Sequence, residues 1–256
     1  MSLTSVPAQS PSTRCSEEEW ALRVDLAAAY RLMAHYGWDD ILATHISVRI
    51  PGPDHQFLIN PFGLLFEEIT ASNLLKVDMH GNVVDPSDYI ANRAGFVVHS
   101  AVHMSRPDAQ CAVHLHTISG TAVSAQPSGL LPISPPAMIM YGKIGYHDFE
   151  GVTVNEDERE RLGEHLGDNW ALILRNHGTL TVGNNVAEAV QRMYHLERAC
   201  QMQIAALSAG PDLHLPDQEI SDLVKKQIGD NFGKVADIAW AALRRKLDRI
   251  CPEYAS

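Results

Sequence analysis

Residues 111–120, CAVHLHTISG, place two histidines one residue apart inside an otherwise apolar run. Successive side chains of a strand alternate between its two faces, so His114 and His116 are expected on one face, opposite Val113 and Leu115. Two neutral imidazoles in this arrangement can bind one metal ion. An isolated H-x-H pair is equally compatible with two rings that are merely hydrogen-bonded within the protein.

A third histidine, His177, ends the apolar run that opens LILRNHGTLTVG (residues 172–183). The run predicts a buried strand, and the Asn-His-Gly after it predicts a tight turn that can present a side chain to a cleft. His177 follows His116 by 61 positions, a separation that adjacent strands can span. Three imidazoles with open coordination positions are typical of a catalytic divalent ion, whereas structural zinc sites use four protein ligands.

Strand and helix patterns are interleaved along the chain without an internal repeat, which predicts one mixed α/β domain with a central sheet covered by helices. Helix 17–36 is the best defined, because Ser16 and Glu19 form a capping box and Gly37 follows its end. Asn155 is expected to cap a later helix. Other helices are expected at 92–104, from 118 and from 185; strands are expected at 42–50, 55–60, 110–117 and 143–149, and as a pair within 169–183.

Three regions are expected: a flexible tail over residues 1–16, a main domain over 17–210 and a helical extension over 211–256. Residues 218–248 contain the basic stretch WAALRRKLDR and predict an amphipathic helix. That helix could cover its own domain or reach a neighbouring subunit.

The chain carries 20 Lys and Arg against 31 Asp and Glu, a formal charge of −11. This balance argues against nucleic acid or an anionic membrane as a partner and favours a small molecule. Four scattered cysteines without a C-x-x-C pair indicate neither a disulfide framework nor a thiolate zinc site, so a reducing cytoplasm is expected. Residues 109–142 lack charges but contain four prolines, which favours burial within protein over a membrane span.

Several stretches together resemble the class II aldolase/adducin family over about residues 17–208; they are INPFGLLFEEITASNLLKVD, NRAGFVVHSAVHMSRPDAQCAVHLHTISGTAVSA, LLPISPPAM, IGYHDFEGV and LILRNHGTLTVG. The resemblance implies a three-layer α/β/α sandwich with a mostly antiparallel central sheet. It implies a homotetramer with sites at subunit interfaces and a small-molecule substrate. It also implies a divalent metal ion, zinc in the sugar-phosphate aldolases, bound by His114, His116 and His177.

The chain departs from the aldolase pattern at the residues that handle the proton and the phosphate. The glutamate that the aldolases place nineteen residues before the first metal histidine is Gly95 here. A phosphate-binding Ser-Ser pair is replaced by Arg93 and Ala94, and a Gly-Asn pair by Thr44 and His45. Ser47 and Gly63 remain as substrate-binding candidates, while the guanidinium of Arg93 suits a carboxylate. A phosphorylated sugar is therefore not expected as the substrate.

Two residues are candidates for the missing proton transfer. His99 lies one helical turn after Gly95, so its ring could face the same cleft, although a core or interface histidine is equally compatible. Tyr141 lies near the loop where the resemblance implies a tyrosine contributed by a neighbouring subunit.

Three functions are compatible with these residues. A metal-dependent lyase, either aldolase-like or a decarboxylase, would act on a small non-phosphorylated carbonyl or carboxylate compound, with zinc as the expected ion and manganese or iron(II) as alternatives. A three-histidine iron(II) oxygenase is the second. The motifs NPFG, AGF and LLPISP are closer to the adducin head than to the sugar aldolases, so a non-catalytic binding or assembly module is the third.

Overall fold

The computed structural model describes residues 15–151, 157–229 and 231–256, and only the backbone of Arg93 and Ala94. One seven-stranded sheet has the order β3-β2-β1-β4-β7-β6-β5, and only the β5–β6 pair is parallel. The strands are β1 (His45–Arg49), β2 (Phe57–Ile59), β3 (Leu75–Val77), β4 (Cys111–Leu115), β5 (Ile144–His147), β6 (Ala171–Leu174) and β7 (Gly178–Gly183). The helices are α1 (Glu17–Tyr36), α2 (Arg93–Ser105), α3 (Ile118–Ser124), α4 (Pro135–Met140), α5 (Glu158–Leu166), α6 (Val186–Leu207), α7 (Gln218–Gly229) and α8 (Phe232–Ile250), with short 3-10 turns η2 (Phe66–Glu68) and η3 (Pro252–Ala255).

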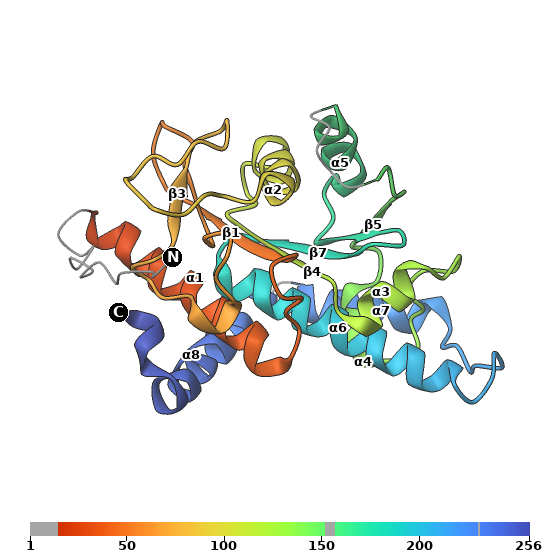
Figure 1. Ribbon diagram of the computed structural model, residues 1–256. Coiled ribbons are helices and arrows are strands. Elements are labelled where there is room, and N and C mark those ends of the chain that lie inside the picture. The colour runs from red at the N-terminus through yellow and green to blue at the C-terminus, as the bar shows by residue number, and fades with distance from the viewer. Residues whose placement is uncertain (1–14, 152–156, 230) are drawn as a thin grey trace.

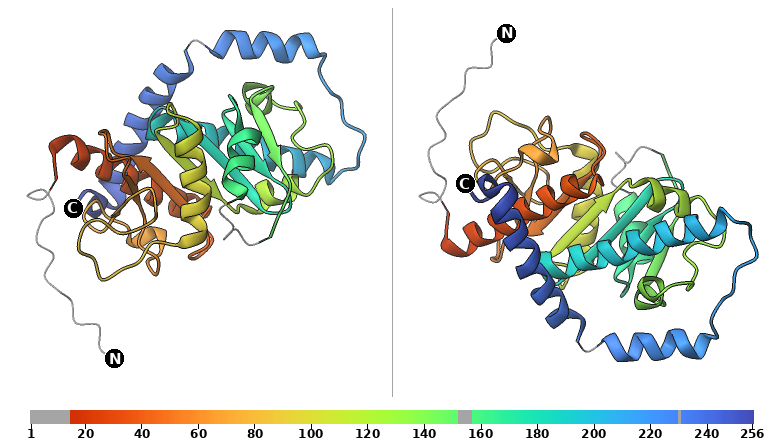
Figure 2. Two further views of the ribbon diagram at one scale, coloured as in Figure 1. Left: turned by 90° about the horizontal axis from the view of Figure 1, so that it is seen from above. Right: turned by 90° about the horizontal axis from the view of Figure 1, so that it is seen from below.

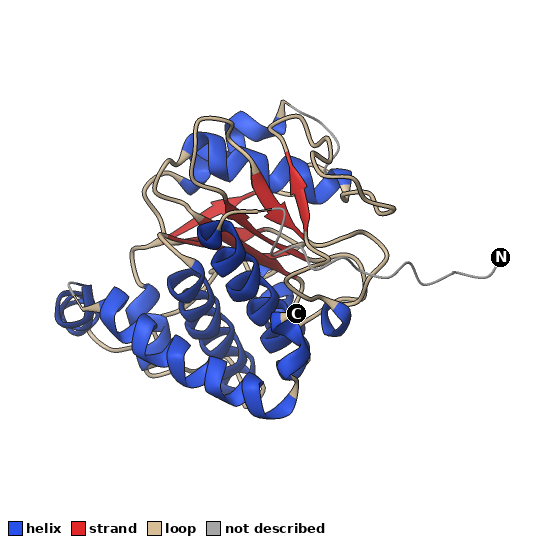
Figure 3. Ribbon diagram, turned by 90° about the vertical axis from the view of Figure 1, so that its left-hand side faces the viewer, coloured by secondary structure: helices blue, strands red, loops and turns tan. Residues whose placement is uncertain are grey.

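Helices cover both faces of the sheet, with α2 and α5 on one side and α1, α6 and α8 on the other (Figures 1 and 3). The central strand β4 shows how the sequence sets these layers. Its odd-numbered residues Cys111, Val113 and Leu115 pack into the core under α1 and α6, while Ala112 packs into the core under α2 and α5. The expected α/β/α sandwich with a mostly antiparallel sheet is confirmed.

Helix α1 has the bounds that the capping residues predict. The Ser16 hydroxyl accepts a hydrogen bond from the Glu19 amide at 3.1 Å, and Gly37 ends the helix in the left-handed conformation at φ +66°. The carboxylate of Glu19 binds Arg23 and Lys76 instead of closing the capping box. The expected cap Asn155 lies outside the described residues.

Two segments differ from the sequence-based expectation. Strand β1 begins at His45 and not at Leu42, because Ile41 has a positive φ of 47° and the chain turns over residues 41–43. Residues 218–248 form two helices, of which α8 packs against the core that α1 and α6 share, whereas α7 lies at the periphery beside α4 (Figure 2). Helix α8 therefore covers its own domain, and the division at residue 210 stays a prediction.

Residues 109–142 include β4, α3 and α4. Within the described residues, none of the helices combines the length and the apolar character that crossing a bilayer requires.

The attachment of α8 can be tested at Trp240, which is 8% exposed and donates its indole N–H to Asp25 at 3.1 Å. Trp240→Ala is expected to lower the free energy of unfolding by about 3–5 kcal/mol, because it removes a large buried side chain. Ile238→Ala on the same helix is the control, since Ile238 is 73% exposed and its loss should change stability by less than about 0.5 kcal/mol. Equal effects of the two substitutions in urea denaturation would contradict this packing.

Candidate metal centre

The alternation of β4 directs His114 to the face of the sheet that α2 covers. Ala112, two residues earlier, packs among Val98 and Ala101 of that helix, so His114 lies on the same side. His114 is buried, and His116 follows just beyond the end of the strand, where the chain turns into α3. The expectation that the two imidazoles point the same way agrees with the structure, in which their rings lie 4.8 Å apart.

His177 is presented by the turn between β6 and β7. Asn176 takes the left-handed conformation at φ +56°, which asparagine tolerates better than most residues. Gly178 is required by close packing, since a Cβ atom there would lie 2.5 Å from the carbonyl oxygen of Leu115. The Asn-His-Gly motif thus brings the turn directly against the end of β4, and the ring of His177 lies 4.9 Å from that of His114.

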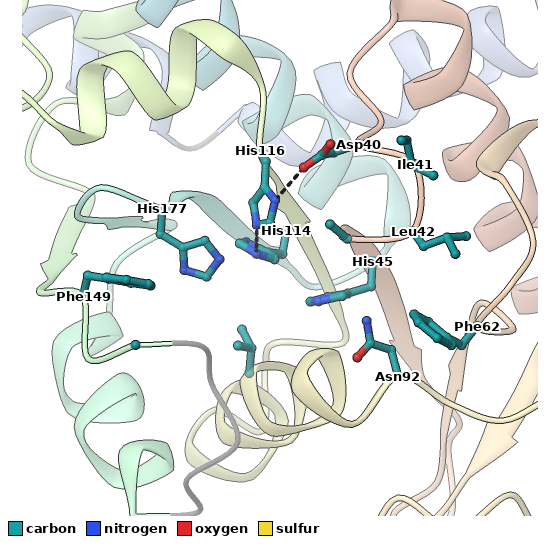
Figure 4. A pocket seen from close by; sticks show the side chains of 13 residues that line it. Asp40, Ile41, Leu42, His45, Phe62, Asn92, His114, His116, Phe149 and His177 are labelled. Carbon is teal, nitrogen blue, oxygen red and sulfur yellow. Dashed lines mark hydrogen bonds and ion pairs between the residues drawn. The ribbon is translucent and has the colours of Figure 1, made fainter.

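One ring nitrogen from each of His114, His116 and His177 lies within 4.8 Å of the other two (Figure 4). The Nδ1 atom of His114 is 3.1 Å from the carbonyl oxygen of Thr179, and Nδ1 of His116 is 3.0 Å from the carboxylate of Asp40. Because both partners are acceptors, each Nδ1 carries the proton and each Nε2 exposes a lone pair. The two Nε2 atoms are 3.0 Å apart. A cation placed between these lone pairs and His177 would remove their repulsion, so the donor set fits a metal ion.

Burial keeps His114 and His177 neutral near neutral pH. It lowers the pKa of His114 well below the ordinary value, and the neighbouring His45 and His177 lower it further. Burial, followed by the proximity of His116, lowers the pKa of His177 to about 4. Neutral imidazoles keep their lone pairs near neutral pH, which is the form that binds metals.

The three histidines line a cavity of about 690 Å³. Its other walls come from residues 40–43, His45, Phe62, Asn92, Val98, Phe149 and Gly151 (Figure 4). Among these described lining residues, none is Lys or Arg. The cavity therefore offers three imidazoles on one side and predominantly apolar walls elsewhere.

From His45 in the cavity wall, buried histidines continue as a row between β1 and α2. The ring of His45 lies 5.0 Å from His114 and 4.7 Å from His99. Ser47 joins His99 to His103 through its hydroxyl, which contacts Nδ1 of His99 and lies 2.7 Å from Nε2 of His103. Burial lowers the pKa of His45 and His99, and it lowers the pKa of His103 to about 3.

The structure separates the residues predicted to act on the substrate. His99 and Tyr141 do not line the described cavity, since His99 lies behind His45 and Tyr141 ends α4. The Ser47 hydroxyl is engaged by two imidazoles, while Gly63 lies next to Phe62 with open space around it. The side chain of Arg93 lies outside the described residues. The catalytic roles of His99 and Tyr141 and the substrate-binding roles of Ser47, Gly63 and Arg93 stay predictions.

Sequence reasoning did not assign a role to His45 or Asp40. In the sequence, His45 stands out only as a departure from the aldolase pattern, although its alternation with Ser47 in a strand indicates a shared face. Asp40 is 76 positions from His116, the imidazole that it orients, and no local pattern marks that contact.

Known proteins share this fold and a large part of this sequence. Residues 24–204 match the family described as Class II Aldolase and Adducin N-terminal domain. Alpha-adducin of Rattus norvegicus is 45% identical over 208 residues, covering 79% of this chain and 28% of that protein. The chain belongs to the class II aldolase and adducin family.

Two solved structures extend the comparison. An aldolase II superfamily protein from Pseudomonas syringae is 49% identical, covers 97% of this chain and 100% of its own, and superposes with a TM-score of 0.93. L-fuculose 1-phosphate aldolase from Glaciozyma antarctica PI12 is 30% identical, covers 97% and 96%, and gives a TM-score of 0.80. The identity is therefore higher to rat adducin than to this aldolase, as the sequence motifs predict.

The histidine row predicts acid sensitivity. His103 is 1% exposed with a pKa of about 3, so the unfolded chain binds more protons than the folded chain below pH 6.5. The free energy of unfolding should fall as the pH falls, by about 2 kcal/mol from this group between pH 7 and pH 5. His103→Gln should remove that contribution, giving a correspondingly smaller loss in urea denaturation at the two pH values. An unchanged loss would show that His103 is not held neutral.

Proposed function

We propose that this protein is a divalent-metal-dependent enzyme of the lyase type, acting on a small non-phosphorylated carbonyl or carboxylate compound. The observation that carries the proposal is the set of three imidazoles from His114, His116 and His177, which converge on one wall of a cavity. Three protein ligands leave coordination positions for a substrate, which is the arrangement of a catalytic and not a structural site. Membership of a family that contains aldolases supports the same reaction class.

Zinc is the favoured ion, because three neutral nitrogen ligands suit it, with manganese or iron(II) as alternatives. When bound, such an ion would polarise a carbonyl oxygen and stabilise negative charge that develops on the substrate. The residues of the chain orient the metal ligands and form the cavity walls. Asp40 and the carbonyl of Thr179 fix the tautomers and orientations of His116 and His114. Phe62, Val98 and Phe149 give the cavity apolar walls.

The expected substrate carries no phosphate. The described lining residues include no Lys or Arg to balance a dianion, and the hydroxyl of Ser47 is already engaged by His99 and His103. Arg93 stays in the proposal as the partner of a carboxylate, because it follows Asn92, which lines the cavity. A decarboxylation or an aldol cleavage of a hydroxy or keto acid fits these residues better than the cleavage of a sugar phosphate.

The alternatives rest on different observations. An iron(II) oxygenase would use the same three ligands with dioxygen at the open positions. A non-catalytic binding or assembly module is supported by the 45% identity to rat alpha-adducin. The family resemblance also supports a homotetramer, and the scattered cysteines support a cytoplasmic location.

Metal content distinguishes these functions. Protein purified without added metal is expected to contain about one zinc or manganese ion per chain by elemental analysis, and His114→Ala should lose most of it. Asp40→Asn should keep the fold but weaken metal affinity by about 10–100-fold, because it removes the group that orients His116.

The controls are His55→Ala and Asp39→Asn, both at exposed positions, and neither should change the metal content. Stoichiometric iron would favour the oxygenase, and wild-type protein without metal would support the binding module and contradict the lyase.

A further inference from the structure

Gly95 lies in the first turn of α2, directly beneath the ring of His45 on β1. A Cβ atom at position 95 would lie 2.5 Å from Cδ2, 2.8 Å from Nε2 and 2.9 Å from Cγ of His45. These distances are far below van der Waals contact. The ring cannot easily move aside, because it packs against His99 at 4.7 Å and His114 at 5.0 Å. With His45 in place, position 95 accepts only glycine.

His45 itself faces the substrate volume. It pairs with His114 across the β1–β4 register, and both residues line the cavity. No nitrogen of His45 belongs to the group formed by His114, His116 and His177, so His45 lies beside the metal ligands without joining them. Its buried Nδ1 has no hydrogen-bond partner among the described residues. A buried polar ring without a partner destabilises the fold, and such groups are characteristic of functional sites.

We propose that the side chain of His45 contacts the substrate. It fills the volume that a side chain at position 95 would occupy, so that an imidazole from β1 takes the place of a side chain from α2. This inference rests on the proposed function, because it needs a substrate held at the metal. In the aldolases that the sequence resembles, position 95 carries a glutamate. An imidazole in the same volume does not bring the negative charge of a carboxylate, so it can form a hydrogen bond to an anionic oxygen without repulsion.

The replacement of a glutamate at position 95 by the ring of His45 therefore indicates a substrate class. A hydroxy or keto acid that places two oxygens toward the metal is anionic, and it would be repelled by a glutamate at position 95. It would be accepted by the ring of His45. The predominantly apolar walls from Ile41, Leu42 and Phe62 would surround the remainder of the molecule.

The first test measures the steric pairing by thermal denaturation and does not require metal. Gly95→Ala should lower the melting temperature by about 4–8 °C in wild type, because it overpacks a buried site. In a His45→Ala background the same substitution should lower it by less than about 2 °C, because the Cβ enters the vacated volume. Gly229→Ala is the control, since its Cβ would meet open space. Equal shifts in both backgrounds would overturn the pairing.

The second test measures ligand contact in metal-loaded protein by calorimetry, with acetohydroxamate as an anionic chelating probe. His45→Ala should weaken binding by about 10-fold or more, and His45→Gln, which restores a hydrogen-bonding group, should recover part of the loss. His103 belongs to the same histidine row but does not line the described cavity, so His103→Gln should bind acetohydroxamate with wild-type affinity. If His45→Ala does not fold, His45→Gln against His45→Leu gives the same comparison.

Metal content is measured for every variant. Wild-type affinity in a His45 variant that keeps its metal would overturn the substrate contact while leaving the proposed function intact. Wild-type protein that binds no metal would overturn both the proposed function and the substrate contact, and the thermal test would then decide the pairing of His45 and Gly95 alone.

Discussion

The close approach of the β6–β7 turn to the end of β4 is the constraint on which the site depends. His114 and His116 come from one strand and its extension, but the third imidazole reaches them only because Gly178 allows the turn to touch the backbone of Leu115. Any side chain at 178 would hold the turn away. The left-handed Asn176 then aims His177 at the same point. Backbone packing, and not side-chain flexibility, thus sets the positions of the nitrogen atoms.

The second condition for the site is the burial of its histidine rings. Ring contacts join His103, His99, His45, His114 and His177 in succession, and burial lowers the pKa of each. Burying polar rings is unfavourable unless they are hydrogen-bonded, and most of these rings have a partner. The hydroxyl of Ser47, for example, is the partner of both His99 and His103. The result is a neutral, lone-pair-rich wall beside an apolar cavity. Such a wall can bind a cation, and the cation can in turn bind an anionic ligand in the cavity.

The sequence could predict the elements whose signals are local. Ser16 and Gly37 define α1, and strand alternation places His114 and His116 on one face. The sequence pattern does not predict helix α4, because the helix begins with Pro135 and Pro136 in a proline-rich stretch, although proline is well tolerated at the start of a helix.

The remaining parts of the site depend on which strands become neighbours. His45 contacts His114 only because β1 pairs with β4. Asp40 contacts His116 only because the loop before β1 lies at the same edge of the cavity as His116. Neither contact has a periodic or capping signature. The family resemblance predicted that His114, His116 and His177 act together and that no glutamate stands at position 95. The volume that His45 fills is visible only from the packing of α2 on β1.

X-ray absorption spectroscopy of the purified protein tests the central claim most directly, because it reports the ligands of a bound ion. The account predicts a divalent ion whose first shell contains three imidazole nitrogens, at about 2.0–2.1 Å for zinc, with oxygen at the open positions. A bound ion without the multiple scattering of at least two imidazoles would contradict it.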